Sequence, residues 1–162
     1  MRNRIRTTLG ILAVAAIALV LVAAPARAEG NTQISGVGVF VGTDECPERP
    51  SLYPPIKMAG GLVGCWYTDT FEVVQNTPSG GYQERGTETF IGCLSDGTTC
   101  GTFSTTYKFT AKYDADGNEI HGRCQHPIVS GTEDFEGITG RVDFKDDVQT
   151  GEFLYGGHIK RP

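Results

Sequence analysis

The feature that most constrains this chain is a two-residue alternation of apolar and polar side chains, which runs through most of it after residue 30. Turn residues, mainly glycine, proline, asparagine and aspartate, interrupt the alternation about every eight to twelve positions. No stretch places apolar residues at helical spacing over three turns. Short alternating segments between regular turns are typical of an all-β sandwich or barrel. We therefore expect an all-β fold without internal repeats or linkers.

The turns divide the chain into seven or eight expected strands in up-and-down order. Prolines at positions 47, 50, 54 and 55 mark a loop after the first strand, because proline removes a hydrogen bond that a central strand needs. The expected strands cover residues 34–41, 62–75, 82–93, 102–113, 119–129, 142–144 and 149–159.

The alternation also assigns side chains to the two faces of each strand. In the segment 102–113, Phe103 and Tyr107 share one face with two further aromatic residues, and the opposite face carries Ser, Thr and Lys. In the segment 119–129, Cys124 and His126 share a face. We expect these four side chains to point into the core.

One expected strand carries carboxylates on its apolar face. Glu84 and Glu88 share this face with Tyr82 and Phe90. A carboxylate in such a place is costly unless it is paired or neutralised. His126 faces the same interior, so the sequence offers these two glutamates and His126 as candidate acid–base groups. The alternative is a hydrogen-bonded core pair without chemistry.

The first 28 residues have the three-part layout of a secretory signal peptide. Three arginines precede an apolar run from Leu9 to about Ala24, and the segment closes on Ala26-Arg27-Ala28. We expect cleavage there, leaving a single domain over residues 29–162. The alternative is an uncleaved anchor, because the run approaches the lower length limit of a membrane span. Secretion implies an extracellular or cell-envelope location and an oxidising setting.

The chain beyond this segment is strongly acidic. The segment holds four of the 14 basic residues and no acid, so residues 29–162 carry 10 Lys and Arg against 19 Asp and Glu. The resulting net charge of −9 repels nucleic acid and anionic membranes, and no basic run interrupts it. We therefore expect no nucleic-acid partner and no stable membrane anchor after cleavage.

Five cysteines can form at most two disulfides. Cys93 and Cys100 flank a six-residue hairpin loop, which keeps them close enough to pair. Cys46 lies in the proline loop near the strand of Cys65, so Cys46–Cys65 is the preferred second bridge and Cys46–Cys124 the alternative. With the preferred pairing, Cys124 is a free buried thiol. No Cys-x-x-Cys spacing occurs, and we expect no metal and no cofactor.

One glycine-rich segment resembles a known family. Residues 131–141, GTEDFEGITGR, resemble the G-T-G-x-F-x-G-x-x-G motif of dirigent and allene-oxide-cyclase-like barrels, with Glu133 where the family usually has glycine. Residues 101–103 and 155–159 are similar to segments of secreted bacterial relatives, so the resemblance covers roughly residues 86–159. It implies an antiparallel, mostly up-and-down, eight-stranded barrel whose cavity confines a small ligand. It carries over no catalytic residue.

Three functions follow from these observations. The leading one is a secreted barrel that holds a small apolar or aromatic ligand, with Trp66, Tyr107 and Tyr155 as candidate contacts. The second is a dirigent-like or cyclase-like isomerase that uses the acid–base candidates above. The third is an extracellular interaction or inhibitor protein that acts through the loop at 44–60. An internal cavity would favour the first two, and a closed core would favour the third.

Overall fold

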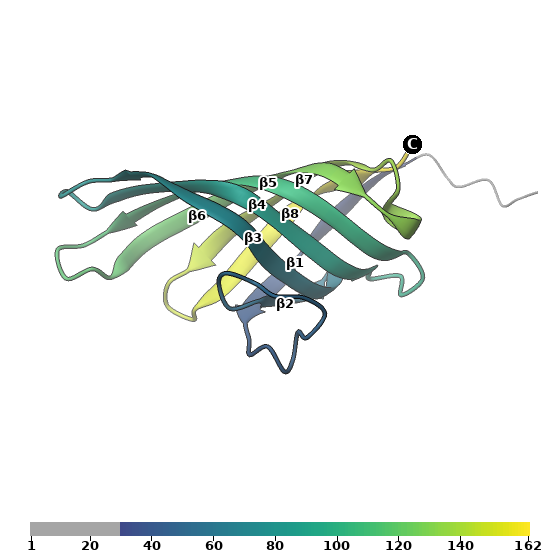
Figure 1. Ribbon diagram of the computed structural model, residues 1–162, viewed down its shortest axis with the longest axis horizontal. Coiled ribbons are helices and arrows are strands. Elements are labelled where there is room, and N and C mark those ends of the chain that lie inside the picture. Colours follow the sequence, from purple (N-terminus) through teal and green to yellow (C-terminus); the bar gives the residue numbers. More distant parts are fainter. Residues whose placement is uncertain (1–29) are drawn as a thin grey trace, which may run out of the picture.

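The computed structural model describes residues 30–162, and the expected signal peptide lies outside them. Eight strands form a closed antiparallel barrel, in which each strand pairs with the next and β8 pairs with β1 (Figure 1). The predictions of an all-β fold and of an eight-stranded antiparallel barrel are thus confirmed. The elements are β1 (Asn31–Phe40), β2 (Ile56–Gly60), β3 (Leu62–Asn76), β4 (Gly81–Leu94), β5 (Cys100–Tyr113), β6 (Glu119–Gly131), the 3-10 helix η1 (Glu133–Phe135), β7 (Thr139–Asp147) and β8 (Glu152–Lys160).

Two strands differ most from the sequence prediction, whereas the ends of the others shift by at most three residues. The sequence assigns β2 to the proline loop, whereas the structure pairs it with β1 and β3. This strand is five residues long and directly follows Pro54 and Pro55, so its own alternation is too short to identify it. Strand β7 extends on both sides of the expected segment 142–144, because residues 139–141 and 145–147 also pair with β8.

The connections between strands alternate between the two ends of the barrel, because neighbouring strands run in opposite directions. The β2–β3, β4–β5 and β6–β7 connections share one end with the chain terminus, which lies beside η1 in Figure 1. We call this the closed end. The remaining hairpins and the proline loop, residues 41–55, lie at the opposite end, which we call the open end.

A cluster of aromatic rings fills the closed end. The Phe103 ring centroid lies 4.9 Å from that of Phe90, 5.4 Å from Phe135 and 5.6 Å from Trp66. None of the four side chains is more than 1 % exposed. Edge-to-face and tilted packing of this kind stabilises a fold beyond the burial of apolar area alone. The structure places Phe103 in the interior, as the alternation predicts.

The proline loop packs against the outside of the barrel. Cys46 in the loop forms a disulfide with Cys65 on β3, and with Tyr67 the two residues make a second buried cluster. A second disulfide joins Cys93 and Cys100 across the β4–β5 connection. Both predicted pairings are confirmed, and the remaining cysteine, at position 124, is free and buried.

Candidate functional site

A cavity of about 390 Å³ occupies the barrel interior at the open end. This volume falls in the range of small-molecule binding sites. Its charged and hydroxyl-bearing walls include Thr68, Glu84, Glu88, Glu119, His126 and Asp146. Its aromatic walls are Phe40, Tyr53, Tyr82, Tyr107, Phe109, Tyr113, Phe144 and Phe153.

Glu84 projects into this cavity from β4 and is only 5 % exposed. Three phenols donate hydrogen bonds to its carboxylate. Tyr53 and Tyr82 reach Oε2 over 2.8 Å and 2.6 Å, and Tyr107 reaches Oε1. An ionised carboxylate only accepts hydrogen bonds, so three O–H donors match it. The costly inward carboxylate therefore accepts hydrogen bonds on both of its oxygens.

A glycine makes room for one of these phenols. Gly86 occupies the inward position between Glu84 and Glu88 on β4. A Cβ atom placed there would lie 2.7 Å from Cε1 of the Tyr107 ring and still closer to the backbone oxygen of Thr70. Any larger residue would displace Tyr107, so the glycine allows the ring to lie across β4 and reach Glu84.

Burial keeps the three phenols protonated. Desolvation, followed by the hydrogen bond to Glu84, raises the pKa of Tyr53 to about 12. The same two causes raise the pKa values of Tyr82 and Tyr107 further. All three tyrosines therefore act as donors at any pH near neutrality, and none of them is a base.

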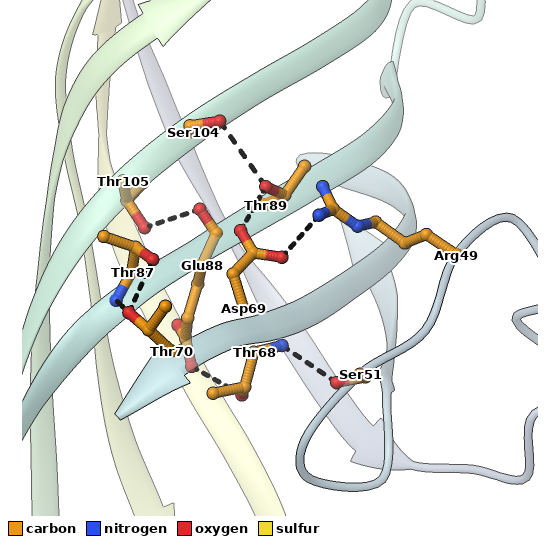
Figure 2. A network of polar contacts seen from close by, with 10 residues as sticks. All are labelled: Arg49, Ser51, Thr68, Asp69, Thr70, Thr87, Glu88, Thr89, Ser104 and Thr105. Atoms are coloured by element: carbon orange, nitrogen blue, oxygen red, sulfur yellow. Dashed lines mark hydrogen bonds and ion pairs between the residues drawn. The ribbon is translucent and has the colours of Figure 1, made fainter. Parts of the chain in front are cut away.

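Glu88 lies deeper in the barrel and has hydrogen-bond partners on three sides. The Trp66 indole N–H donates to Oε2 over 2.6 Å. The Thr68 hydroxyl donates to Oε1 over 3.0 Å, as Figure 2 shows. The His126 Nε2 atom lies 2.9 Å from Oε2. These contacts join Glu88 to β3 and β6 and hold its carboxyl group at the inner end of the cavity.

The hydrogen bonds of His126 fix how many protons the pair carries. Its Nδ1 lies 3.0 Å from the backbone oxygen of Val142, which can only accept, so Nδ1 carries a proton. Without a proton between them, His126 Nε2 and Glu88 Oε2 would be two acceptors in contact. One more proton is therefore needed, either on Nε2 or on Oε2. The pair therefore holds one transferable proton and is neutral in total. This is the chemistry of a general acid–base pair.

A carboxyl pair lies at the mouth of the cavity. Glu119 and Asp146 approach each other above Gly122, where an added Cβ atom would collide with both side chains. Desolvation, the hydrogen bond between the two groups and the charge of Asp146 raise the pKa of Glu119 to about 7. Desolvation also raises the pKa of Asp146. The two groups share a proton in mildly acidic solution.

The proline loop is held against β3 and β4 by polar contacts, which Figure 2 shows from close by. Arg49 forms an ion pair of 2.7 Å with Asp69, and the Thr89 hydroxyl donates to the same carboxylate over 2.6 Å. The Thr68 backbone N–H donates to the Ser51 hydroxyl over 2.9 Å. Together with the Cys46–Cys65 disulfide, these contacts position Tyr53 over Glu84.

The structure brings some of the candidate residues together and separates others. Glu84, Glu88, His126 and Tyr107 all line the cavity. Trp66 and Tyr155 belong to the hydrophobic core instead. The Tyr155 hydroxyl accepts a hydrogen bond from the Leu62 N–H over 2.7 Å and donates one to the Ala59 backbone oxygen over 3.0 Å. These two bonds hold the β2–β3 turn against β8.

Cys124, the free thiol, also lines the cavity from β6. Burial, followed by the charge of Glu88, raises its pKa well above the usual range. The thiol therefore stays protonated and is a poor nucleophile.

Sequence reasoning did not single out Tyr53, Glu119 and Asp146. Asp146 has the inward parity of Val142 and Phe144, so extending the expected strand by two residues would have found it. Glu119 faces inward because a register shift interrupts the β5–β6 pairing, and no periodicity reveals that. Tyr53 lies in an irregular loop, where alternation gives no signal.

Within residues 30–162, no group of three or more His, Cys, Asp or Glu side chains gathers closely enough to hold a metal ion. In the same part of the chain, no helix has the length and apolar character needed to cross a membrane. Comparisons with protein-family models, with curated proteins and with solved structures found no match.

Proposed function

We propose that this protein holds a small apolar or aromatic ligand inside its barrel. The observation that carries the proposal is the cavity of about 390 Å³ with eight aromatic rings in its walls. A core that served stability alone would fill this space with side chains, as the closed end does. The cavity also favours ligand binding over an interaction protein that acts through its loops.

We also propose that the protein works outside the cytoplasm as a relative of the allene-oxide-cyclase-like barrels. Two disulfides support an oxidising location. The backbone at Glu133 has a φ of 57°, in the left-handed region that glycine favours. This is the position at which the family motif usually has glycine, so the local geometry supports the resemblance.

The test of the main proposal is native mass spectrometry of protein purified from its own secretion medium. We expect a population heavier than the bare chain, which releases a small organic molecule on denaturation. Protein that carries no ligand and binds none from an extract of that medium would contradict the proposal. N-terminal sequencing of the same material should begin at Glu29 and would test the proposed secretion.

A second candidate function is proton transfer to a bound ligand, as in a cyclase or isomerase. The observation that favours it is the contact between Glu88 and His126, which lie on the cavity wall and share one transferable proton. The compound recovered from the native protein should be converted by the wild type. The folded Glu88→Gln variant should bind it without converting it. Equal conversion by this variant would contradict the catalytic function.

A further inference from the structure

The charged side chains that line the cavity are mostly acidic. Its ionisable walls include Glu84, Glu88, Glu119 and Asp146, and no Lys or Arg is among the described residues that line it. His126 is the one basic ring, and its proton is shared with Glu88. The cavity therefore has an excess of negative charge that no side chain in its walls neutralises.

Two of these sites can carry that excess. Glu84 accepts three phenolic hydrogen bonds and has no cation as a partner among them. The carboxyl groups of Glu119 and Asp146 carry one negative charge between them while they share one proton, and they carry a second once Glu119 loses that proton near pH 7. Buried charges without an opposite charge are costly, and a cation that enters the cavity would offset this cost.

The walls offer a second, independent kind of attraction. The negative faces of aromatic rings attract cations, more strongly where water is excluded. Eight rings surround the same space, including Phe109 and Phe144. Apolar surface and negative charge together match a molecule with a cationic head and an apolar body.

We propose that the occupant of the cavity is an organic cation, with an ammonium group attached to an apolar or aromatic body. This inference rests on the proposed ligand-binding function and names the chemical class of the ligand. The ammonium group lies near Glu84 and its tyrosines, and the body lies against the phenylalanines of the open end. A carboxylate or phosphate ligand would meet like charges without a partner and is excluded on the same grounds.

Three probes that share a phenyl ring test the inference: 2-phenylethylammonium, 2-phenylethanol and phenylacetate. Calorimetry at pH 7, with the emission of the chain's single tryptophan as a second readout, measures their affinities. We expect the cation to bind at least about tenfold more tightly than the alcohol, which corresponds to about 1.4 kcal/mol, and phenylacetate not to bind measurably. An alcohol or phenylacetate that binds as tightly as the cation would overturn the inference and leave ligand binding intact. Binding of none of the three would contradict the proposed function itself.

A pair of variants locates the effect. Glu84→Gln removes one negative charge inside the cavity, whereas Glu72→Gln removes one from the outside of β3, where the side chain is 63 % exposed. We expect Glu84→Gln to weaken 2-phenylethylammonium at least about tenfold and to change 2-phenylethanol less than about threefold. Glu72→Gln should change neither. Equal weakening of both probes, or an equal effect of the two variants, would overturn the role of Glu84.

Circular dichroism checks that Glu84→Gln remains folded. If it does not, Asp146→Asn replaces it in measurements at pH 8, where Glu119 of the wild type has lost the shared proton, so this change removes one charge at the mouth of the cavity without breaking the tyrosine contacts. The same selective loss of cation affinity is expected, and unchanged affinity for the cation would overturn the inference.

Discussion

On strand β4, Phe90 points into the closed end of the barrel and Glu84 into the open end, from the same face of one strand. Strand β5 repeats the contrast, with Phe103 among aromatic rings and Tyr107 donating to a carboxylate. The closed end is packed with aromatic side chains, whereas the open end contains carboxylates, phenols and a cavity. The same alternation thus produces two different interiors within one barrel.

The difference between the two ends separates residues that stabilise the fold from residues that depend on it. Ring packing at the closed end lowers the free energy of the folded state directly. At the open end, Glu84 and Glu88 cost free energy to bury, and each is held by several hydrogen bonds. Groups that are costly to bury and hydrogen-bonded around an open space are typical of a binding or catalytic site.

The largest effect should come from removing a ring at the closed end. We expect Phe103→Ala to lower the free energy of unfolding by about 3–5 kcal/mol, because it leaves a cavity among three other rings. Phe109→Ala, at the open end, removes a ring that already borders empty space and should cost less than half as much. Urea denaturation followed by circular dichroism measures both. Equal losses would mean that the two ends do not differ in packing.

Loss of the disulfide beside the open end should come next. The loop that Cys46–Cys65 closes is longer than that of Cys93–Cys100, so Cys46→Ala with Cys65→Ala should cost about 3 kcal/mol, and Cys93→Ala with Cys100→Ala should cost about 2 kcal/mol. Urea denaturation measures both double variants.

The two disulfides should also differ in their effect on the cavity. Only loss of Cys46–Cys65 frees the loop that carries Tyr53, so only that variant should weaken binding of 2-phenylethanol in calorimetry. Weakened binding after loss of Cys93–Cys100 would show that the two ends are coupled.

Glu88 lies between the two ends, because it contacts Trp66 of the aromatic cluster and also lines the cavity. Its replacement tests whether a residue at this position contributes to stability. We expect Glu88→Gln to lower the free energy of unfolding by about 1–3 kcal/mol, because the amide cannot satisfy Trp66, Thr68 and His126 together. The emission of Trp66 should shift as its N–H loses a carboxylate partner. Glu72→Gln, in an exposed ion pair, should cost less than about 1 kcal/mol. Equal stability of the two variants would mean that Glu88 has no structural role.

The smallest effect should be a pH dependence from the mouth of the cavity, because water screens the partly exposed carboxyl groups there. The pKa of Glu119 is about 7 in the folded protein and 4.5 in its ordinary state, so the folded protein retains a proton that the unfolded chain releases. The free energy of unfolding should therefore fall as pH rises from about 4.5 to about 7, and then level off.

Glu119→Gln should remove this dependence, because the amide donates to Asp146 at every pH. Thermal denaturation should find the variant close to the wild type at pH 4.5 and more stable than it at pH 8. A constant difference across this range would mean that Glu119 and Asp146 do not share a proton.

The sequence alone predicted most of the strands and the side of the sheet on which key residues lie. The period of two fixes the face of each side chain, so Phe103, Glu84, Glu88 and His126 were all placed in the interior. The short loop between Cys93 and Cys100 predicted their disulfide. These features depend on residues close together in the sequence, for which chain geometry leaves few alternatives.

Only the tertiary structure decided which inward residues meet. Closure of the barrel pairs residues 56–60 as strand β2 and places Tyr53 of the proline loop over Glu84. The register between strands sets the position of each residue along the barrel axis. This position separates Trp66 from the cavity and brings Glu119 next to Asp146. Alternation contains no information about this position, because it repeats identically along every strand, whereas strand pairing and loop packing link residues that are distant in the sequence.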